Sequence, residues 1–368
     1  MAPTHSNTMP MQQLDHICSP VPTATQLRIA NAFWAATTPT GSPSGVRPYT
    51  PTALEPYFKY YTEQCKTVYH SLGTNLPFSK HDDIIQLAQE IGKQGLTRQQ
   101  VLQSVEGRYP VAVPNTQFDK AELITGAVNL AARLLLMVDV GVPAMTNRMW
   151  TGRAFRSWDA GSIRDFTASI FPVQRPNGGR QSGIELDMDF NARNLDAIGG
   201  FKVELTNNLL DHLEMVDIEG ETTVMIFHHA SFLMNQEHRL FPHGFVQETI
   251  QTLALLFPQN KWYKDSKSWY YRRLKPTLID DDDGILACGP LTMTNIDAYQ
   301  FWHDRLVRLK MVYDQAKPRT LRQWWNDRRE GTQWYALWVA VGFTIFFGLI
   351  QSIEGALQVY KAYSPAQG

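Results

Sequence analysis

Four histidines lie within sixteen residues, a region of the chain where metal or hydrolase chemistry could occur. They are His228, His229, His238 and His243. A zinc hydrolase of the H-E-x-x-H type needs the reverse order of Glu237 and His238. Ser231 follows His229 closely, but without the glycines of a nucleophile elbow. The pattern therefore favours hydrogen-bonded structural histidines over a zinc site or a catalytic triad.

Two acidic patterns could hold a divalent cation. Asp187 and Asp189 form a D-x-D, which many glycosyltransferases use to hold a metal–nucleotide complex. The four aspartates 280–283 precede Gly284, yet an EF-hand loop placed on that glycine would end at Pro290 where glutamate is needed. We therefore expect a solvated strand face in the first case and a solvated acidic loop in the second. The sequence predicts no metal and no other cofactor.

Residues 261–275 interleave six cations with five aromatic residues. Such a segment can stack bases and pair phosphates, or lie on an anionic membrane surface. An amphipathic surface segment that packs its rings and aliphatic stems onto the domain explains it equally well. The whole chain carries 34 basic and 35 acidic residues, a net charge of −1. This balance does not imply bulk attraction to nucleic acid, so we favour the surface-segment interpretation over nucleic-acid binding.

A long apolar run near the C-terminus predicts a membrane span over 334–353. Between Trp334 and Ile350, Thr344 is the one polar residue. The predicted span also includes Trp338, Val341 and Phe346. Twenty helical residues measure roughly 30 Å, about the thickness of the hydrocarbon core of a bilayer. The lipid bilayer is therefore the first partner that the sequence predicts.

The charges that flank this span predict its orientation. Five cations precede it and Lys361 follows it. The five are Lys317, Arg319, Arg322, Arg328 and Arg329. By the positive-inside rule the N-terminal side faces the cytosol. We expect a single-pass, tail-anchored protein with the bulk of the chain in the cytosol. The ER and the nuclear envelope are the candidate membranes.

Small residues recur at every fourth position of the span. They form a ridge of Ala336, Ala340, Thr344, Gly348, Ser352 and Ala356. Close backbone approach through small residues is a usual basis of helix association in lipid. We expect a helix–helix contact along this ridge, with a second copy or with another membrane protein; a lone helix is the alternative.

The elements in front of the span predict a mainly α fold with a small β component (α+β). Helices are expected at 82–91, 97–105, 119–141, 206–216, 245–257 and 295–316, and strands at 184–190, 201–205 and 223–227. Arg133 and Asp139 make 119–141 a core helix and not a membrane span. The three cysteines are too few and too scattered for a disulfide framework.

The domain organisation follows from these patterns. We expect a disordered leader at 1–25, a cytosolic domain at 26–318 with a possible sub-boundary near 145–180, a basic and aromatic juxtamembrane segment at 319–333, the span at 334–353 and a short tail at 354–368.

Several segments resemble a set of uncharacterised membrane proteins of filamentous fungi. They include LITGAVNLAARLLLMVDVG, TTVMIFHHASFL and, most specifically, the block from Arg319 to Tyr363. The resemblance covers about 119–363 and implies a fungal, membrane-anchored protein, without supplying a catalytic residue.

The leading function is thus a membrane-anchored interaction or scaffold protein, more than an enzyme. The alternatives are a metal-dependent transferase or hydrolase using Asp187 and Asp189 or His228 and His229, and nucleic-acid or anionic-lipid binding through 261–275.

Overall fold

The computed structural model describes most of the chain. The described residues are 16–34, 53–72, 78–108, 119–141, 155–174, 182–187, 189–218, 220–236, 240–259, 263–277, 280, 282–316, 325 and 331–363. The chain divides into two compact units, one of 1–196 with 201–315 and one of 197–200 with 316–368. The fold is mainly helical with a small three-stranded mixed sheet, which confirms the predicted fold class.

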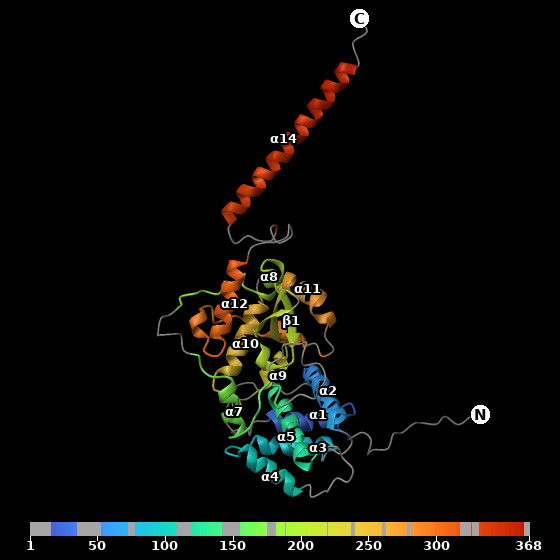
Figure 1. Cartoon of the computed structure of the whole chain (residues 1–368), viewed down its shortest axis with the longest axis vertical. Coiled ribbons are helices and arrows are strands. Elements are labelled where there is room, and N and C mark those ends of the chain that lie inside the picture. Colours follow the sequence, from blue (N-terminus) through green and yellow to red (C-terminus); the bar gives the residue numbers. More distant parts are fainter. Residues whose placement is uncertain are drawn as a thin grey trace, which may run out of the picture. The chain divides into compact units, whose positions relative to one another are not determined.

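The first five helices lie at one end of the large unit, where three of them contact the fifth, α5 (Figure 1). They are α1 (Thr23–Trp34), α2 (Glu55–Leu72), α3 (His81–Ile91), α4 (Arg98–Arg108) and α5 (Lys120–Leu136). α2, α3 and α4 each contact α5, and α1 contacts α3. Capping boxes start α4 and α5, because the Thr97 and Asp119 amides donate to the side chains of Gln100 and Glu122.

α5 is the core helix that the sequence predicts, although it ends at Leu136 and not near Gly141. Met137 takes a left-handed conformation with φ 49° and closes the helix. The buried Arg133 side chain donates from Nε to the carbonyl of Val140, 2.8 Å away, so the charge inside this apolar helix is satisfied by the chain that follows it.

The predicted disordered leader is corrected in its second half. Residues 1–15 lie outside the described part of the chain, but the chain is folded from His16 onward. Ile17 is fully buried and its amide donates to the carbonyl of Ser79 at 3.0 Å. α1 then begins at Thr23, so the folded part of the chain starts before residue 26.

The sheet has the order β1-β3-β2. β1 (Lys202–Thr206) pairs in parallel with β3 (Glu221–Phe227), and β2 (Met215–Ile218) pairs antiparallel with the other edge of β3. The parallel register places Thr206 beside Phe227. The strands predicted at 201–205 and 223–227 are confirmed.

The helix predicted over 206–216 is wrong. The segment forms a 3-10 turn, η2 (Leu209–Asp211), and then enters β2. The Asn208 side chain accepts the Leu210 amide at 3.3 Å, a local bond that competes with helix formation. Leu213 then turns left-handed at φ 60°, and its amide donates to Met225 of β3.

Among the described residues, two further helices of the large unit precede the sheet in the sequence and four follow it. They are α7 (Ile163–Ile170), α8 (Ala192–Ala197), α9 (Ala230–Asn235), α10 (Phe245–Leu256), α11 (Tyr263–Arg273) and α12 (His303–Gln315), with 3-10 turns η3 (Lys275–Thr277), η4 (Asp283–Ala287) and η5 (Ile296–Ala298). α10 confirms the helix predicted at 245–257. α9 contacts α10 and η4, and its Phe232 ring stacks on Tyr57 of α2, which joins the two ends of the unit.

Two further predicted elements differ from the structure. Among its described residues, the segment 184–190 alternates in burial as expected, with Leu186 and Phe190 inside, but the pairing recorded there is a single bridge between Glu185 and Asn295. The helix predicted from Asn295 begins at His303 instead, because 296–298 forms η5.

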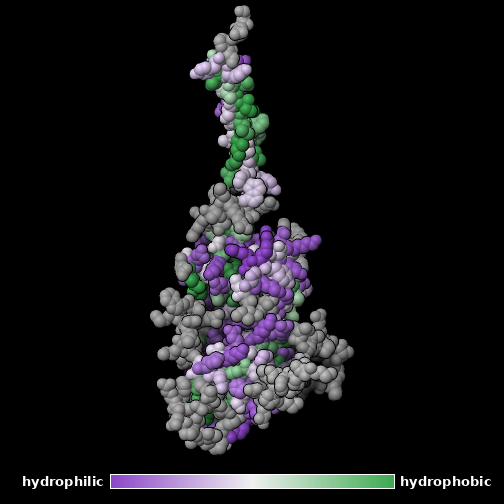
Figure 2. Space-filling model, turned by 90° about the vertical axis from the view of Figure 1, so that its right-hand side faces the viewer, coloured by the Kyte–Doolittle hydropathy of each residue, from purple (hydrophilic) through white to green (hydrophobic). Residues whose placement is uncertain are grey.

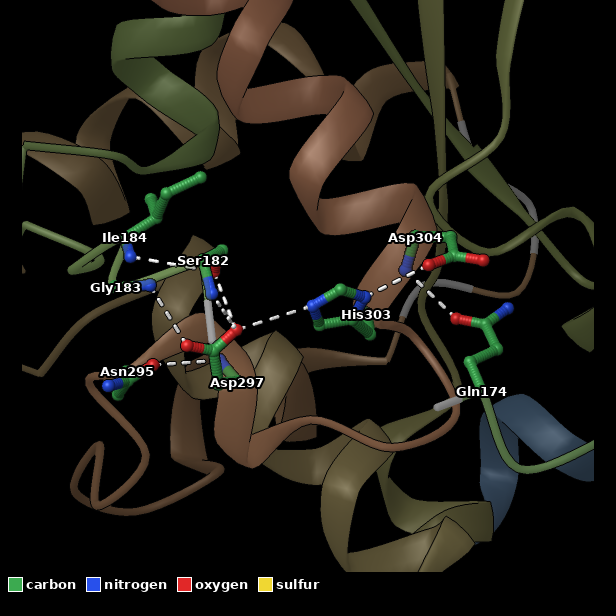
Figure 3. A network of polar contacts seen from close by, with 8 residues as sticks. All are labelled: Gln174, Ser182, Gly183, Ile184, Asn295, Asp297, His303 and Asp304. Atoms are coloured by element: carbon green, nitrogen blue, oxygen red, sulfur yellow. Dashed lines mark hydrogen bonds and ion pairs between the residues drawn. The ribbon is translucent and has the colours of Figure 1, made fainter. Parts of the chain in front are cut away.

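Asp297 joins these two segments (Figure 3). Its carboxylate accepts the Ser182 amide and hydroxyl and the Gly183 amide at 2.6–3.0 Å, and lies 3.5 Å from Nε2 of His303. The Ser182 hydroxyl above all, together with the two amides, lowers the pKa of Asp297 to about 2. The carboxylate therefore holds the 182–184 segment beside the start of α12.

The second unit contains α14 (Gly331–Tyr363), whose 33 residues measure about 50 Å. It is the one helix among the described residues long and apolar enough to cross a membrane. Its apolar side chains are exposed, as at Phe343 and Ile345, and Figure 2 shows hydrophobic residues along it. The helix continues ten residues past the predicted span, since no proline interrupts it before Pro365.

Candidate metal centre

The candidate site lies where two parallel strands end at the same edge of the sheet. β1 ends at Thr206, with Asn207 next in the chain, and β3 ends at Phe227, followed by His228 and His229. Because the carboxyl ends of parallel strands share one edge, polar side chains that follow them are brought together there.

The turn after β3 aims two successive histidines at the same place. Side chains at adjacent positions of a strand point to opposite faces. Here the strand has ended, and the amide of Ala230 donates to the carbonyl of His228 at 2.8 Å as α9 begins. The two imidazole rings consequently lie with centroids 4.2 Å apart and planes 35° from parallel.

Asp280 completes the cluster from a distant part of the sequence. It lies between η3 and η4 and is buried, as are both histidines. Its Oδ1 is 3.6 Å from Nε2 of His228, and its Oδ2 is 3.3 Å from Nε2 of His229. The three donor atoms lie within 4.8 Å of one another, close enough to share one ion.

Asp282 fastens the loop that carries Asp280. Its Oδ2 accepts the amide and the hydroxyl of Ser231 at 2.7 and 2.6 Å, and its Oδ1 accepts the amide of Gly284 at 2.8 Å. The predicted solvated acidic loop is therefore wrong for Asp280 and Asp282, both of which are buried against α9. The expectation holds for Asp283, which is exposed and pairs with Lys275 at 3.1 Å.

The hydrogen-bond partners of His228 constrain its protonation. Nδ1 faces the backbone carbonyl of Thr206 at 3.1 Å, so it carries a proton and donates. Nε2 faces the backbone carbonyl of Asp280 at 3.3 Å in addition to the carboxylate. A neutral imidazole has one N–H, so Nε2 needs a second proton or a bound cation to face these oxygens favourably.

His229 faces oxygens with one nitrogen and has no partner at the other. Nε2 lies 3.0 Å from Oδ1 of Asn207, while Nδ1 is buried without a hydrogen-bond partner. The rings of Tyr60 and Phe227 lie 5.8 Å from the His229 ring and keep the surroundings apolar. The sequence predicted hydrogen-bonded structural histidines. Nδ1 of His229 does not fit this prediction, because it has no hydrogen-bond partner.

Burial and the contacts between the three side chains together set the charges of the cluster. Burial and then the neighbouring His228 lower the pKa of His229 to about 4, so this imidazole is neutral near pH 7. Burial raises the pKa of Asp280, but the polar contacts with both histidines outweigh it and leave that pKa below its ordinary value. An ionised carboxylate therefore lies in a buried, aromatic-lined site between two imidazoles.

The other sequence candidates do not join this cluster. Asp187 and Asp189 are exposed and are not among the three side chains that could share an ion within the described residues. His243 is exposed, and His238 lies outside the described residues. The structure therefore pairs His228 and His229 with an aspartate that the sequence patterns assigned to a separate loop.

The basic and aromatic segment folds as α11 and packs as an amphipathic surface helix. Trp269 and Tyr270 are buried, and the Trp269 indole donates to Asp196 at 2.7 Å. Arg273 lies 3.6 Å from the same aspartate. Since these rings and charges already have partners, they favour the packing interpretation over base stacking. Residues 261 and 262 lie outside the described part.

No family model, no curated protein and no solved structure matches this chain. The resemblance to membrane proteins of filamentous fungi therefore stays a prediction.

Proposed function

We propose that this protein is a single-pass membrane protein in which α14 anchors a large helical domain at a membrane surface. The exposed apolar surface of α14 is the observation that carries this proposal. In water, side chains such as Phe343, Ile345 and Phe346, each more than half exposed, would present a continuous apolar surface of the kind that soluble monomers avoid. In a bilayer the same surface is solvated by lipid.

The backbone and hydroxyl groups of α14 suit a lipid environment. A helix satisfies its backbone groups internally, as hydrocarbon requires. Thr344 donates its hydroxyl to the carbonyl of Ala340 and Ser352 to that of Gly348, each at 2.9 Å. The two polar side chains of the ridge therefore need no water.

We further propose that the large domain faces the cytosol. The support is the charge pattern, with five cations before the span and Lys361 after it. The five cations lie at 317–329, outside the described residues, so this part of the proposal rests on the sequence. The aromatic residues Trp325, Trp334 and Trp338, whose rings lie within 4.6–6.2 Å of one another, suit the interface on that side.

The activity that we propose is binding and not catalysis: α14 meets the helix of a second copy or of another membrane protein. This rests on the ridge of small residues from Ala336 to Ala356, a surface fit for helix association. Leucine substitutions on the ridge, with one off the ridge as control, test it.

The anchor is tested by alkaline carbonate extraction of membranes that contain the full-length protein. We expect it to stay in the pellet, and a version truncated before residue 331 to move to the supernatant. Release of the full-length protein with the peripheral proteins would contradict the anchor.

The orientation is tested separately by protease treatment of sealed microsomes. We expect digestion of the large domain and protection of a small C-terminal fragment. Protection of the large domain would reverse the orientation and leave the anchor intact.

A further inference from the structure

We propose that His228, His229 and Asp280 bind one divalent transition-metal ion, of which Zn²⁺ is the representative, and that this ion fastens the 280–284 loop to the strand ends. The donors would be Nε2 of each histidine and the carboxylate of Asp280. The site is structural, since all three side chains are buried. The proposal is independent of the membrane anchor.

The spacing of the donor atoms fits a coordination sphere better than a set of hydrogen bonds. Bonds of about 2.0–2.2 Å at angles of about 90–109° place neighbouring donors about 2.8–3.6 Å apart. Nε2 of His228 lies 3.6 Å from Oδ1 of Asp280, and Nε2 of His229 lies 3.3 Å from Oδ2, so both separations fall in this range. A charge-assisted N–H···O bond would measure about 2.7–2.9 Å.

A fourth donor is already in place. Oδ1 of Asn207 lies 3.0 Å from Nε2 of His229, which is also the spacing of adjacent ligands. Two imidazoles, a carboxylate and an amide oxygen form a nitrogen and oxygen donor set, which favours Zn²⁺ and other first-row ions over Ca²⁺.

The surroundings orient His228 and the Asp280 loop as they do ligands in known metal sites. A histidine that binds metal through Nε2 usually donates Nδ1–H to a carbonyl or carboxylate. His228 does so to Thr206 at 3.1 Å. Asp282, by holding Ser231 and Gly284, fixes the loop that presents Asp280.

A cation also accounts for the way these polar groups face one another. Oδ2 of Asp280 is buried without a hydrogen bond, although Nε2 of His229 lies 3.3 Å away. Nε2 of His228 faces only oxygens, while its Nδ1 already donates to Thr206. A metal ion would satisfy Oδ2 of Asp280 and would make a second proton on His228 unnecessary. The competing explanation is a proton on His228 that forms a buried ion pair with Asp280; it needs no metal.

The test uses the full-length protein, purified in detergent with a tag that contains no histidine. We expect about one equivalent of metal per chain by elemental mass spectrometry. After removal by a chelator, added Zn²⁺ should restore the metal and raise Tm on the order of 5 °C. Co²⁺ in place of Zn²⁺ should give a visible d–d spectrum.

Matched variants locate the site. Asp280→Asn and His228→Gln should lose the bound metal and the Tm response to Zn²⁺. Asp283→Asn and His243→Gln, which change exposed side chains of the same types, should keep both. If the first pair fails to fold, metal content, chelator response and the Co²⁺ spectrum of the wild type decide the matter.

The proposal is overturned if the wild type contains no metal and its Tm does not change on adding Zn²⁺ after chelation. That result is the one expected of the proton-mediated ion pair. Equal metal content in the wild type and in the folded Asp280→Asn variant would also overturn it.

Discussion

At the scale of single residues, one carboxylate determines where the last helix of the large domain begins. Glu248 is buried in the first turn of α10, and its oxygens accept the amides of Gln300, Phe301 and Trp302 at 2.7–2.8 Å. These three amides immediately precede α12, so Glu248 holds them outside the helix. A local sequence pattern cannot reveal this, because the acceptor lies more than fifty residues away.

Glu248→Gln should therefore destabilise the domain by about 1–3 kcal/mol, because the new amide group turns a donor toward the Gln300 N–H. Chemical unfolding of the full chain in detergent measures the change. Gln247→Ala, an exposed neighbour on the same turn, should stay within about 0.5 kcal/mol. Equal stability of Glu248→Gln and the wild type would show that these contacts contribute nothing net.

His212 should give the domain an acid-sensitive stability. The Thr252 hydroxyl donates to the Thr249 carbonyl, so Nε2–H of His212 donates to that hydroxyl, at 2.7 Å, while Nδ1 accepts the Phe227 amide at 3.1 Å. A second proton would displace the Phe227 bond. Burial first, and then the nearby Arg305, lower the pKa of His212 to about 3.

The unfolded chain binds a proton at this histidine below about pH 6.5, and the folded chain only below about pH 3. Between these values the unfolded state holds more protons, so stability falls as pH falls, by up to about 1.4 kcal/mol per pH unit, and is unaffected above pH 6.5. His212→Asn should flatten the profile from pH 6.5 to 5, with exposed His243→Asn as control. Parallel profiles in wild type and His212→Asn would reject this role.

The candidate metal site shows what residue patterns can and cannot predict. The proximity of His228 and His229 was visible in the sequence, but successive residues of a strand should diverge, and only the turn into α9 aligns them. Asp280 comes from a loop some fifty residues later, brought in by the contacts of Asp282. Spacing within one segment carries no signal for such a site.

At the scale of elements, the sequence predicted the helix starts whose causes are local and missed the segments that depend on distant partners. The capping boxes at Thr97 and Asp119 act through residues three apart, so the sequence contains their whole cause. The 206–216 segment instead depends on pairing with β3, and 184–190 on a single bridge to Asn295. Their conformations follow from partners distant in the sequence.

The junction between α2 and α5 depends on one hydroxyl. Tyr57 of α2 is fully buried and donates to the carbonyl of Leu134 at 2.8 Å. Leu134 lies in the last turn of α5, where carbonyls have no partner within the helix. Tyr57→Phe should leave this carbonyl unsatisfied and cost about 1–3 kcal/mol in chemical unfolding.

Tyr271→Phe is the matched control for this junction. It removes a hydroxyl that donates to Asp283 at 3.2 Å on the exposed surface, so its cost should stay below about 0.5 kcal/mol. Similar costs for the two variants would mean that the Leu134 carbonyl finds another donor.

At the scale of the whole molecule, the two units differ in whether their apolar surface is buried. The large unit buries its aromatic residues, including Tyr57, Phe232 and Trp302, whereas α14 exposes its own. The apolar run that predicted the span needed no tertiary context, because its length alone matches a bilayer. The helix nevertheless extends to Tyr363, ten residues past the predicted span.

The ridge of small residues leads to the last prediction, which tests how the protein associates in the membrane. With Thr344 and Ser352 bonded to their own helix, close packing and not hydrogen bonding would drive association along the ridge. Ala340→Leu and Gly348→Leu should therefore reduce dimerisation of α14 in a membrane reporter assay, or capture of its partner by crosslinking of the full chain.

Gly342→Leu is the matched control, since Gly342 and Gly348 both face open space while Gly342 lies off the ridge. It makes the same substitution in the same helix and should leave association unchanged. If Gly348→Leu and Gly342→Leu behave alike in both assays, the small residues face lipid and α14 is an anchor alone. A selective loss at Gly348 would assign the ridge to a partner helix.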